Sequence, residues 1–192
     1  MQTRITTLIP KERVGVLVGV DGETKNRIES TLNVTLQIAS ETGIVEITPK
    51  SDSTDPVSPL RARDIVTAVG RGFSPENAFL LFDDDMVLDL IDLREIIGRN
   101  ESDIKRMKGR IIGQQGKATR IIEEMSKARL SIFVDTVGFI GDYDTISIAR
   151  EAVGILLEGR QHATLYRFLR SKHREMKKKE TLELWERPVR PP

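Results

Sequence analysis

The residues best suited to chemistry lie in a short, glycine-spaced segment in the second half of the chain. Residues 113–116 have the sequence GQQG, and RII precedes them at 110–112. Glycine has no Cβ, so an anionic ligand can approach the main-chain N–H groups closely, and the N-terminus of a following helix adds partial positive charge. The segment therefore predicts a site that holds a phosphate group.

Two common nucleotide-binding loops do not fit this segment. A Walker-type loop, GxxxxGK[ST], would need glycine at 111 and Ser or Thr at 118, where the chain has Ile111 and Ala118. The dinucleotide fingerprint GxGxxG would also need glycine at 111. The spacing therefore argues against both classes of mononucleotide and dinucleotide site.

The charge of the chain is divided between its halves. The net charge is +1, but residues 1–93 hold 9 Lys and Arg against 15 Asp and Glu, whereas residues 94–192 hold 21 against 14. This asymmetry indicates that the second half meets a polyanion. Between Ile104 and Ile122 there are six basic residues and no acidic one. The excess positive charge thus surrounds the glycine segment.

The glycine segment occurs twice. Residues 15–38 align without a gap on residues 109–132, and the matched glycines are Gly15, Gly19 and Gly22 with Gly109, Gly113 and Gly116. The first copy has four basic and three acidic residues over 10–28, and Asp21 lies inside its loop. A carboxylate there opposes phosphate binding. We therefore expect the second copy to be the main binding site for a polyanion and the first to be a degenerate copy used for packing, protein contact or auxiliary contact with the same ligand.

The elements that position these loops predict an α+β fold. Alternating and helical periodicities give each copy the order βααββα plus an extra helix, in modules at 1–83 and 84–179 followed by an extended tail at 180–192. Gly138 and Gly141 are expected to bound a short strand at 139–140. Trp185 in the tail could anchor a partner or pack on the body. Lys177 to Lys179 end the last predicted helix, where they could contact RNA or complement the helix terminus.

Several function classes lack the residues they need. The chain has no Cys and only two His, and no nucleophile with a matching base emerges, so we predict no catalytic residue, no metal site and no cofactor. Asp83 to Asp85 form an expected solvated turn between modules. No apolar run reaches the roughly 18 residues of a membrane span, and the N-terminus lacks a secretory apolar segment, so we expect a cytoplasmic protein without membrane contact.

Residues 110–133, RIIGQQGKATRIIEEMSKARLSIF, resemble the core of a type I KH module, whose GxxG loop holds about four single-stranded nucleotides. Two such modules with a degenerate first copy resemble the partner-of-Nob family of small-subunit ribosome assembly factors and the related Krr-type factors, in a compact archaeal form. The resemblance implies binding to the 3′ region of small-subunit (pre-)rRNA. It also implies partnership with a PIN-domain endonuclease or other small-subunit assembly or translation proteins.

Charge, loop position and the resemblance together predict the binding residues. The expected RNA contacts are Lys108, Arg110, Ile112, Gly113, Gln114, Gln115, Gly116, Lys117, Arg120 and Ile132. Ile112 and Ile132 are expected in the apolar floor under the bases, together with Ile122 and Leu130 unless these belong to the core. Secondary RNA or protein contacts are expected at Gly19, Val20, Asp21 and Gly22. The alternatives are a KH-fold protein-interaction adaptor or a general RNA-binding subunit of an RNA processing or degradation complex.

Overall fold

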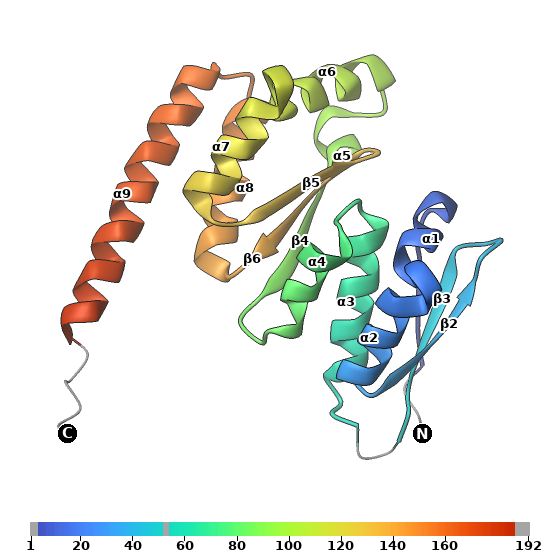
Figure 1. Ribbon diagram of the computed structural model, residues 1–192. Coiled ribbons are helices and arrows are strands. Elements are labelled where there is room, and N and C mark those ends of the chain that lie inside the picture. Colours follow the sequence, from blue (N-terminus) through green and yellow to red (C-terminus); the bar gives the residue numbers. More distant parts are fainter. Residues whose placement is uncertain (1–3, 52–53, 187–192) are drawn as a thin grey trace.

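The computed structural model describes residues 4–51 and 54–186, and within them the chain forms two α+β modules (Figure 1). Each module contains a three-stranded antiparallel sheet with helices packed on one face. The predicted fold class and the tandem of KH-like modules are confirmed. Across the described residues, none of the helices has the length and apolarity that crossing a membrane requires.

The first module follows the predicted order. Its elements are β1 (Ile5–Leu8), α1 (Lys11–Val18), the 3-10 turn η1 (Val20–Gly22), α2 (Glu23–Thr31), β2 (Val34–Ala39), β3 (Ile44–Pro49), α3 (Ser58–Gly70), α4 (Pro75–Ala78) and η2 (Phe79–Phe82). The sheet order is β1-β3-β2, so the last strand lies in the centre. Ser74 caps α4 by accepting a hydrogen bond from the N–H of Asn77, and Pro75 follows at the first helical position.

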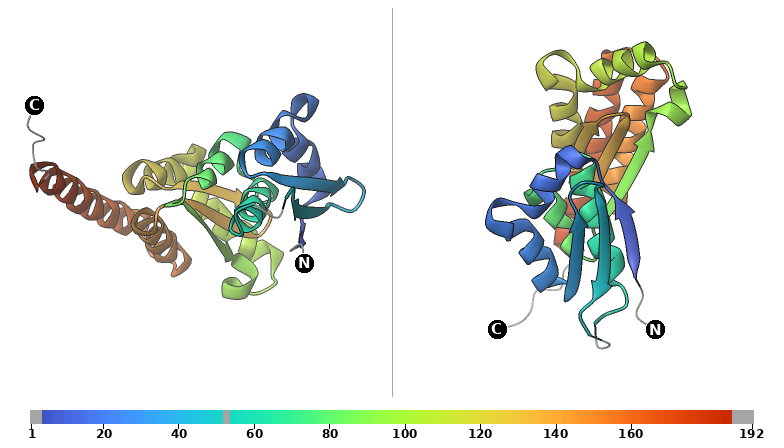
Figure 2. Two further views of the ribbon diagram at one scale, coloured as in Figure 1. Left: turned by 90° about the horizontal axis from the view of Figure 1, so that it is seen from below. Right: turned by 90° about the vertical axis from the view of Figure 1, so that its right-hand side faces the viewer.

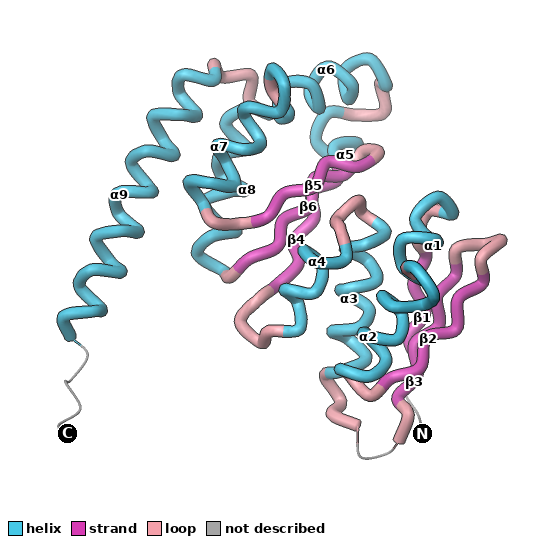
Figure 3. Tube along the Cα trace, viewed as in Figure 1, coloured by secondary structure: helices cyan, strands magenta, loops and turns pink. Residues whose placement is uncertain are grey.

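The second module repeats this topology with longer helices (Figure 3). Its elements are β4 (Val87–Asp92), α5 (Leu93–Ile97), α6 (Glu101–Ile112), η3 (Gln114–Gly116), α7 (Lys117–Ser126), β5 (Arg129–Phe133), β6 (Thr136–Gly141), α8 (Tyr143–Leu157) and α9 (His162–Glu186). The sheet order β4-β6-β5 again places the last strand in the centre. The short helix α5 was not predicted from the sequence.

A glutamate at matched positions connects the same helix and strand in both modules. The carboxylate of Glu29 accepts a hydrogen bond from the N–H of Leu36 at 2.7 Å, and that of Glu123 accepts one from Leu130 at 2.9 Å. Each bond ties the helix after the glycine loop to the strand that follows it. The sequence match at these positions therefore preserves a contact that fixes the position of the loop relative to the sheet.

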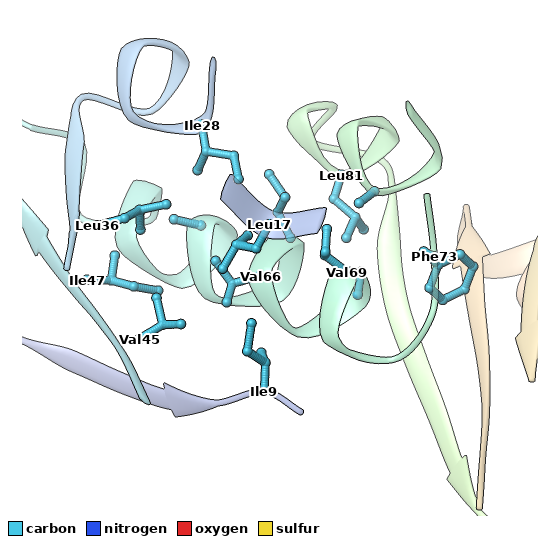
Figure 4. Packing of buried hydrophobic residues seen from close by; sticks show 14 of the residues in the cluster. Ile9, Leu17, Ile28, Leu36, Val45, Ile47, Val66, Val69, Phe73 and Leu81 are labelled. Carbon is cyan, nitrogen blue, oxygen red and sulfur yellow. The ribbon is translucent and has the colours of Figure 1, made fainter. Parts of the chain in front are cut away.

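The two modules share a packed interface. Along β6, Val137 and Phe139 face the helices of the second module, whereas Ile140 belongs to the core of the first. The ring of Phe73 lies directly on Gly138, since a Cβ at that glycine would sit 2.7 Å from the ring. Figure 4 shows Phe73 at the end of the first core that lies nearest the strands of the second module. The central strand β6 is buried on both faces as a result.

Polar contacts accompany this packing. The hydroxyl of Ser131 donates to the carbonyl of Arg71 at 2.9 Å, and the Arg71 guanidinium donates to the hydroxyl of Thr136 at 3.3 Å. The guanidinium of Arg13 donates to the carbonyl of Phe73 at 2.6 Å, and its central carbon lies 5.7 Å from the ring centroid of Phe133. Burial lowers the pKa of Arg13, and the neighbouring Glu12 acts in the opposite direction. The side chain thus spans the boundary between the modules.

Two boundaries differ from the prediction. β6 runs for six residues rather than two, because Gly138 lies inside the strand to admit Phe73 and does not end it. Helix α9 continues to Glu186, so residues 180–186 are helical and not an extended tail. The rest of the predicted tail and the side chain of Trp185 lie outside the described parts of the structure. Figure 2 shows α9 projecting beyond the body of the molecule.

Candidate nucleic-acid interface

The glycine loop of the second module is a sharp turn between α6 and α7. The N–H of Gly113 closes the last turn of α6 on the carbonyl of Gly109 at 2.9 Å. The backbone then passes through positive φ at Gly113 (72°), Gln115 (53°) and Gly116 (72°), and α7 begins at Lys117. Left-handed φ values favour glycine, which explains its presence at both ends of the turn. The N–H of Gly116 donates to the carbonyl of Gly113 at 3.2 Å within the turn, which ends at the N-terminus of α7.

The two glycines of this loop have different physical roles. A Cβ at Gly113 would lie 2.7 Å from the Cβ of Ala118 and 2.9 Å from its nitrogen, so this glycine lets the loop pack on α7. At Gly116, no described atom lies within 4 Å of the position a Cβ would take. The space beside Gly116 is therefore open to a ligand, which is what a phosphate clamp requires.

The polar residues predicted around the loop are mostly accessible. Gln114, Gln115 and Lys117 are exposed, and the exposed Arg120 donates to the carbonyl of Gln115 at 2.9 Å. Lys108 is half-buried on the last turns of α6. These residues bring positive charge and amide groups to the loop and to the helix ends on either side of it. Their contact with RNA stays a prediction.

The side chain of Arg110 makes its contacts outside the glycine loop. Its guanidinium donates to the carbonyl of Arg160 at 2.7 Å, and its own carbonyl contacts the ring of His162 at 2.9 Å. Its Nε is buried, and among the described residues no hydrogen-bond partner reaches it. Arg110 therefore braces the connection between α8 and α9, a role that its spacing from the glycines did not reveal.

The exposed fractions of the four candidate residues show which of them could form an apolar floor under the bases. Ile122 is fully buried and Leu130 is 8% exposed, so both belong to the core of the second module. Ile112 is 38% exposed, and Ile132 is half-buried on β5. Only the last two present apolar surface that a base could contact. The prediction of base contacts at Ile112 and Ile132 is consistent with their placement.

The loop of the first module has the same backbone and a different charge. Its φ values are 77° at Gly19, 50° at Asp21 and 81° at Gly22, and a Cβ at Gly19 would collide with Thr24. The side chains of Asp21 and Glu23 are exposed beside the turn. The two loops thus share the packing that fixes their backbone, but the first has acidic side chains where the second has Gln115 and Lys117.

A cavity of about 500 Å³ lies beside this first loop and was missed by sequence reasoning. Val16, Glu23 and Phe79 are among its lining residues, and the guanidinium carbon of Arg27 lies 4.4 Å from the Phe79 ring centroid. In the aligned sequence, Val16 stands where the second module has Arg110. The shorter side chain at this aligned position is the feature of the sequence that could have indicated an open space.

The remaining acidic residues form no metal site in the described part of the chain, where no group of three or more His, Asp or Glu has a metal-binding arrangement. In the turn between the modules, Asp84 pairs with Arg61, and the carboxylate of Asp83 accepts a hydrogen bond from the N–H of Asp85 at 3.1 Å. This acidic turn is thus occupied with local contacts.

Comparison with known proteins relates this geometry to a family. Residues 87–174 match the family model for the second KH domain of PNO1, a eukaryotic-type (type I) KH domain. The chain is 43% identical over 179 residues to the KH domain-containing protein MJ0443 of Methanocaldococcus jannaschii, covering 93% of this chain and 78% of that protein. It is 28% identical to the pre-rRNA-processing protein PNO1 of Coccidioides immitis, covering 77% of this chain and 58% of that protein.

A solved structure is also similar over most of the chain. It is the complex of a/eIF2α, aDim2p and rRNA from Pyrococcus horikoshii, with a TM-score of 0.84 and 41% identity. The match covers 91% of this chain and 96% of the matched chain. The similarity therefore extends across both modules, including the first loop.

Proposed function

The chain belongs to the PNO1/Dim2 family of KH-domain pre-rRNA-processing proteins, which are non-enzymatic RNA-binding assembly factors, and on this premise we propose that it binds the 3′ region of small-subunit (pre-)rRNA during ribosome biogenesis. The second module clamps single-stranded RNA there. The observation that carries the proposal is the open backbone at Gly116 beside the exposed cations Lys117 and Arg120. Phosphate binding needs both features, because close approach supplies hydrogen bonds and the cations supply counterion release.

The first module has a secondary role in this proposal. Asp21 stands where the second loop has Gln115, and Glu23 stands where it has Lys117. Two negative charges beside the turn reduce its attraction for phosphate, although the backbone is suited to it. The loop at Gly19, Val20, Asp21 and Gly22 then serves auxiliary RNA or protein contact.

The proposed partners follow from relatives and resemblance. The Pyrococcus horikoshii relative has been solved with rRNA and a/eIF2α, so we extend both contacts to this chain. A PIN-domain endonuclease is the further partner that the family resemblance implies. The chain spans 58% of the length of the Coccidioides immitis relative, and the partners of the longer fungal protein are extended only to the shared region.

A protein-interaction role for the first module is the second candidate function, favoured by one observation. Val20 is 78% exposed at the tip of the first loop, next to the cavity lined by Val16 and Phe79. An exposed apolar tip beside a cavity is suited to a protein contact. If this were the function of the whole chain, single-stranded RNA would bind weakly and with little salt dependence.

Crosslinking in cells, followed by sequencing of the attached RNA, tests the main proposal. We expect reads concentrated at the 3′ end of small-subunit rRNA and its precursor. A variant with Gly116→Asp, expressed at the same level, is the matched control and should lose that peak. Reads spread over messenger RNA without a peak at the rRNA 3′ end would contradict the proposal.

A further inference from the structure

Helix α9 has one packed face and one strongly basic face. Leu165 and Leu169 are buried against the second module, and the His173 ring contacts the carbonyl of Met125 on α7 at 3.1 Å. The opposite face carries what we call the α9 basic ridge, which consists of Arg167, Arg170, Arg174, Lys177 and Lys178. At 3.6 residues per turn these five lie within a sector of about 100°, and all are exposed. Between 163 and 181, that sector contains no acidic residue.

The ridge side chains lack partners within the described structure. None of the five forms an ion pair or a side-chain hydrogen bond with another described residue, although cations on the other sides of the helix do. Lys172 pairs with Glu175 at 3.1 Å, and Lys179 pairs with Asp144 at 3.0 Å. Like charges three and four residues apart on a helix repel each other. The ridge therefore holds unrelieved positive charge that a polyanion would neutralise.

The ridge lies along a path that leads away from the clamp. Helix α9 begins at His162, whose ring contacts the carbonyl of Arg110 in the last turn of α6, just before the glycine loop. From there α9 runs beside α7, the helix that leaves the loop (Figures 1 and 2). The ridge spans about 16 Å of helix from Arg167 to Lys178. The KH loop holds only about four nucleotides, so a longer RNA must continue beyond it.

We propose that the α9 basic ridge binds the sugar–phosphate backbone of RNA that extends beyond the clamp. This inference rests on the proposed function, and it assigns a second contact surface on the same RNA. Guanidinium groups match phosphate in a bidentate geometry, and lysines act as point charges beside them. The other residues of this sector between 163 and 181 are Ala163 and Thr181, which offer no aromatic surface for stacking. The ridge thus contributes affinity without reading the base sequence.

Two double variants of the full chain, each lowering the net charge by two, separate the ridge from its surroundings. The ridge variant is Arg170→Gln with Arg174→Gln, and the matched control is Lys172→Gln with Lys179→Gln on the same helix. Arg167 is left unchanged, because it also borders a groove that contains Glu151 and Glu158. The probes are an RNA of about six nucleotides from the small-subunit rRNA 3′ end, slightly longer than the clamp, and one of about 30 nucleotides that contains it.

We expect the ridge variant to bind the longer RNA on the order of tenfold more weakly at 0.1 M salt, with a salt slope reduced by about 1.4, because each lost phosphate contact contributes about 0.7. Its affinity for the short RNA and both affinities of the control variant should stay within twofold of the wild type. Circular dichroism melts check that the helix is intact. A second pair, Arg174→Gln with Lys177→Gln, should repeat the result.

Gly116→Asp distinguishes failure of the ridge from failure of the proposed function. If Gly116→Asp weakens both RNAs while the ridge variants bind both like the wild type, the ridge inference is overturned and the clamp stands. Equal losses in the ridge and control variants would also overturn it, as would loss of an acidic protein partner with RNA binding unchanged. If Gly116→Asp leaves the short RNA bound, the proposed function itself is wrong.

Discussion

The two modules hold nearly identical turns in opposite electrostatic surroundings. At the two glycines and at the residue before the second one, Asp21 or Gln115, the φ and ψ angles of the two loops differ by no more than 9°. Gly19 and Gly113 both pack on the helix that follows, where a Cβ would lie within 3 Å of Thr24 or Ala118. The backbone of the turn is therefore a property of the fold, whereas the charge beside it and the open space at Gly116 are the features on which our proposal of RNA binding rests.

The modules also differ in what covers their sheets. The outer face of the first sheet is accessible, and Leu8 on β1 is 69% exposed there. The equivalent face of the second sheet packs on Phe73 and its neighbours from the first module. The first module therefore covers the face of the second sheet that lies opposite its helices, and this role does not depend on what the first loop binds.

Removing the ring of Phe73 should have the largest effect, because it breaks the link between the modules. We expect Phe73→Ala to lower the free energy of unfolding by about 3–5 kcal/mol, as is usual for a buried Phe replaced by Ala. Urea denaturation followed by circular dichroism measures the loss. Leu8→Ala, on the exposed face, is the control and should change stability little. A loss below about 1 kcal/mol for Phe73→Ala would mean that the modules are held together elsewhere.

The paired substitutions Gly116→Asp and Gly22→Asp compare the loops directly. Both positions have positive φ, 72° and 81°, so the backbone strain is similar. We expect RNA affinity to fall by a factor of about 100 or more for Gly116→Asp, the loss of roughly 3 kcal/mol, and by less than about threefold for Gly22→Asp. Fluorescence anisotropy with single-stranded RNA measures both. The reverse order would assign the main clamp to the first module.

Gln115→Asp gives the second loop the charge of the first on an unchanged backbone. We expect about fivefold weaker RNA binding, because a carboxylate roughly 4 Å from a phosphate repels it by about 1 kcal/mol even in water. Gln115→Asn removes the charge and keeps the shape of the substituted side chain, so it is the matched control. The difference between the two variants should shrink at high salt. If both variants bind equally at low salt, charge does not explain the contrast.

Asp21→Asn should have the smallest effect, a gain of about twofold to threefold in RNA affinity, since it removes one unfavourable charge from a loop with few cations. Titration at low ionic strength measures it best. Glu41→Gln, on the exposed turn between β2 and β3, controls for the change in net charge. An equal gain in the control would show that the effect is not local to the loop.

Local features were the ones that the sequence could predict. The glycines at 113 and 116, the Asp21 difference and the repeat all depend on neighbouring residues or on a fixed offset, and the predicted loops and fold class follow from them. Gly138 was misread as the end of a strand, because the reason for a glycine there is Phe73, distant in sequence. The partner of Arg110, the carbonyl of Arg160, is also set by tertiary packing. Helix α9 continues past residue 180, because the sequence there contains no residue that would end a helix.

The place of Ile140 in the first core has a consequence for synthesis on the ribosome. Domains generally fold from the N-terminus as the chain emerges. Residues 5–82 contain all the strands and helices of the first module, yet the core they surround is closed on one side by Ile140. The first module therefore leaves the exit tunnel with part of its core uncovered, and it completes its folding only after β6 has been translated.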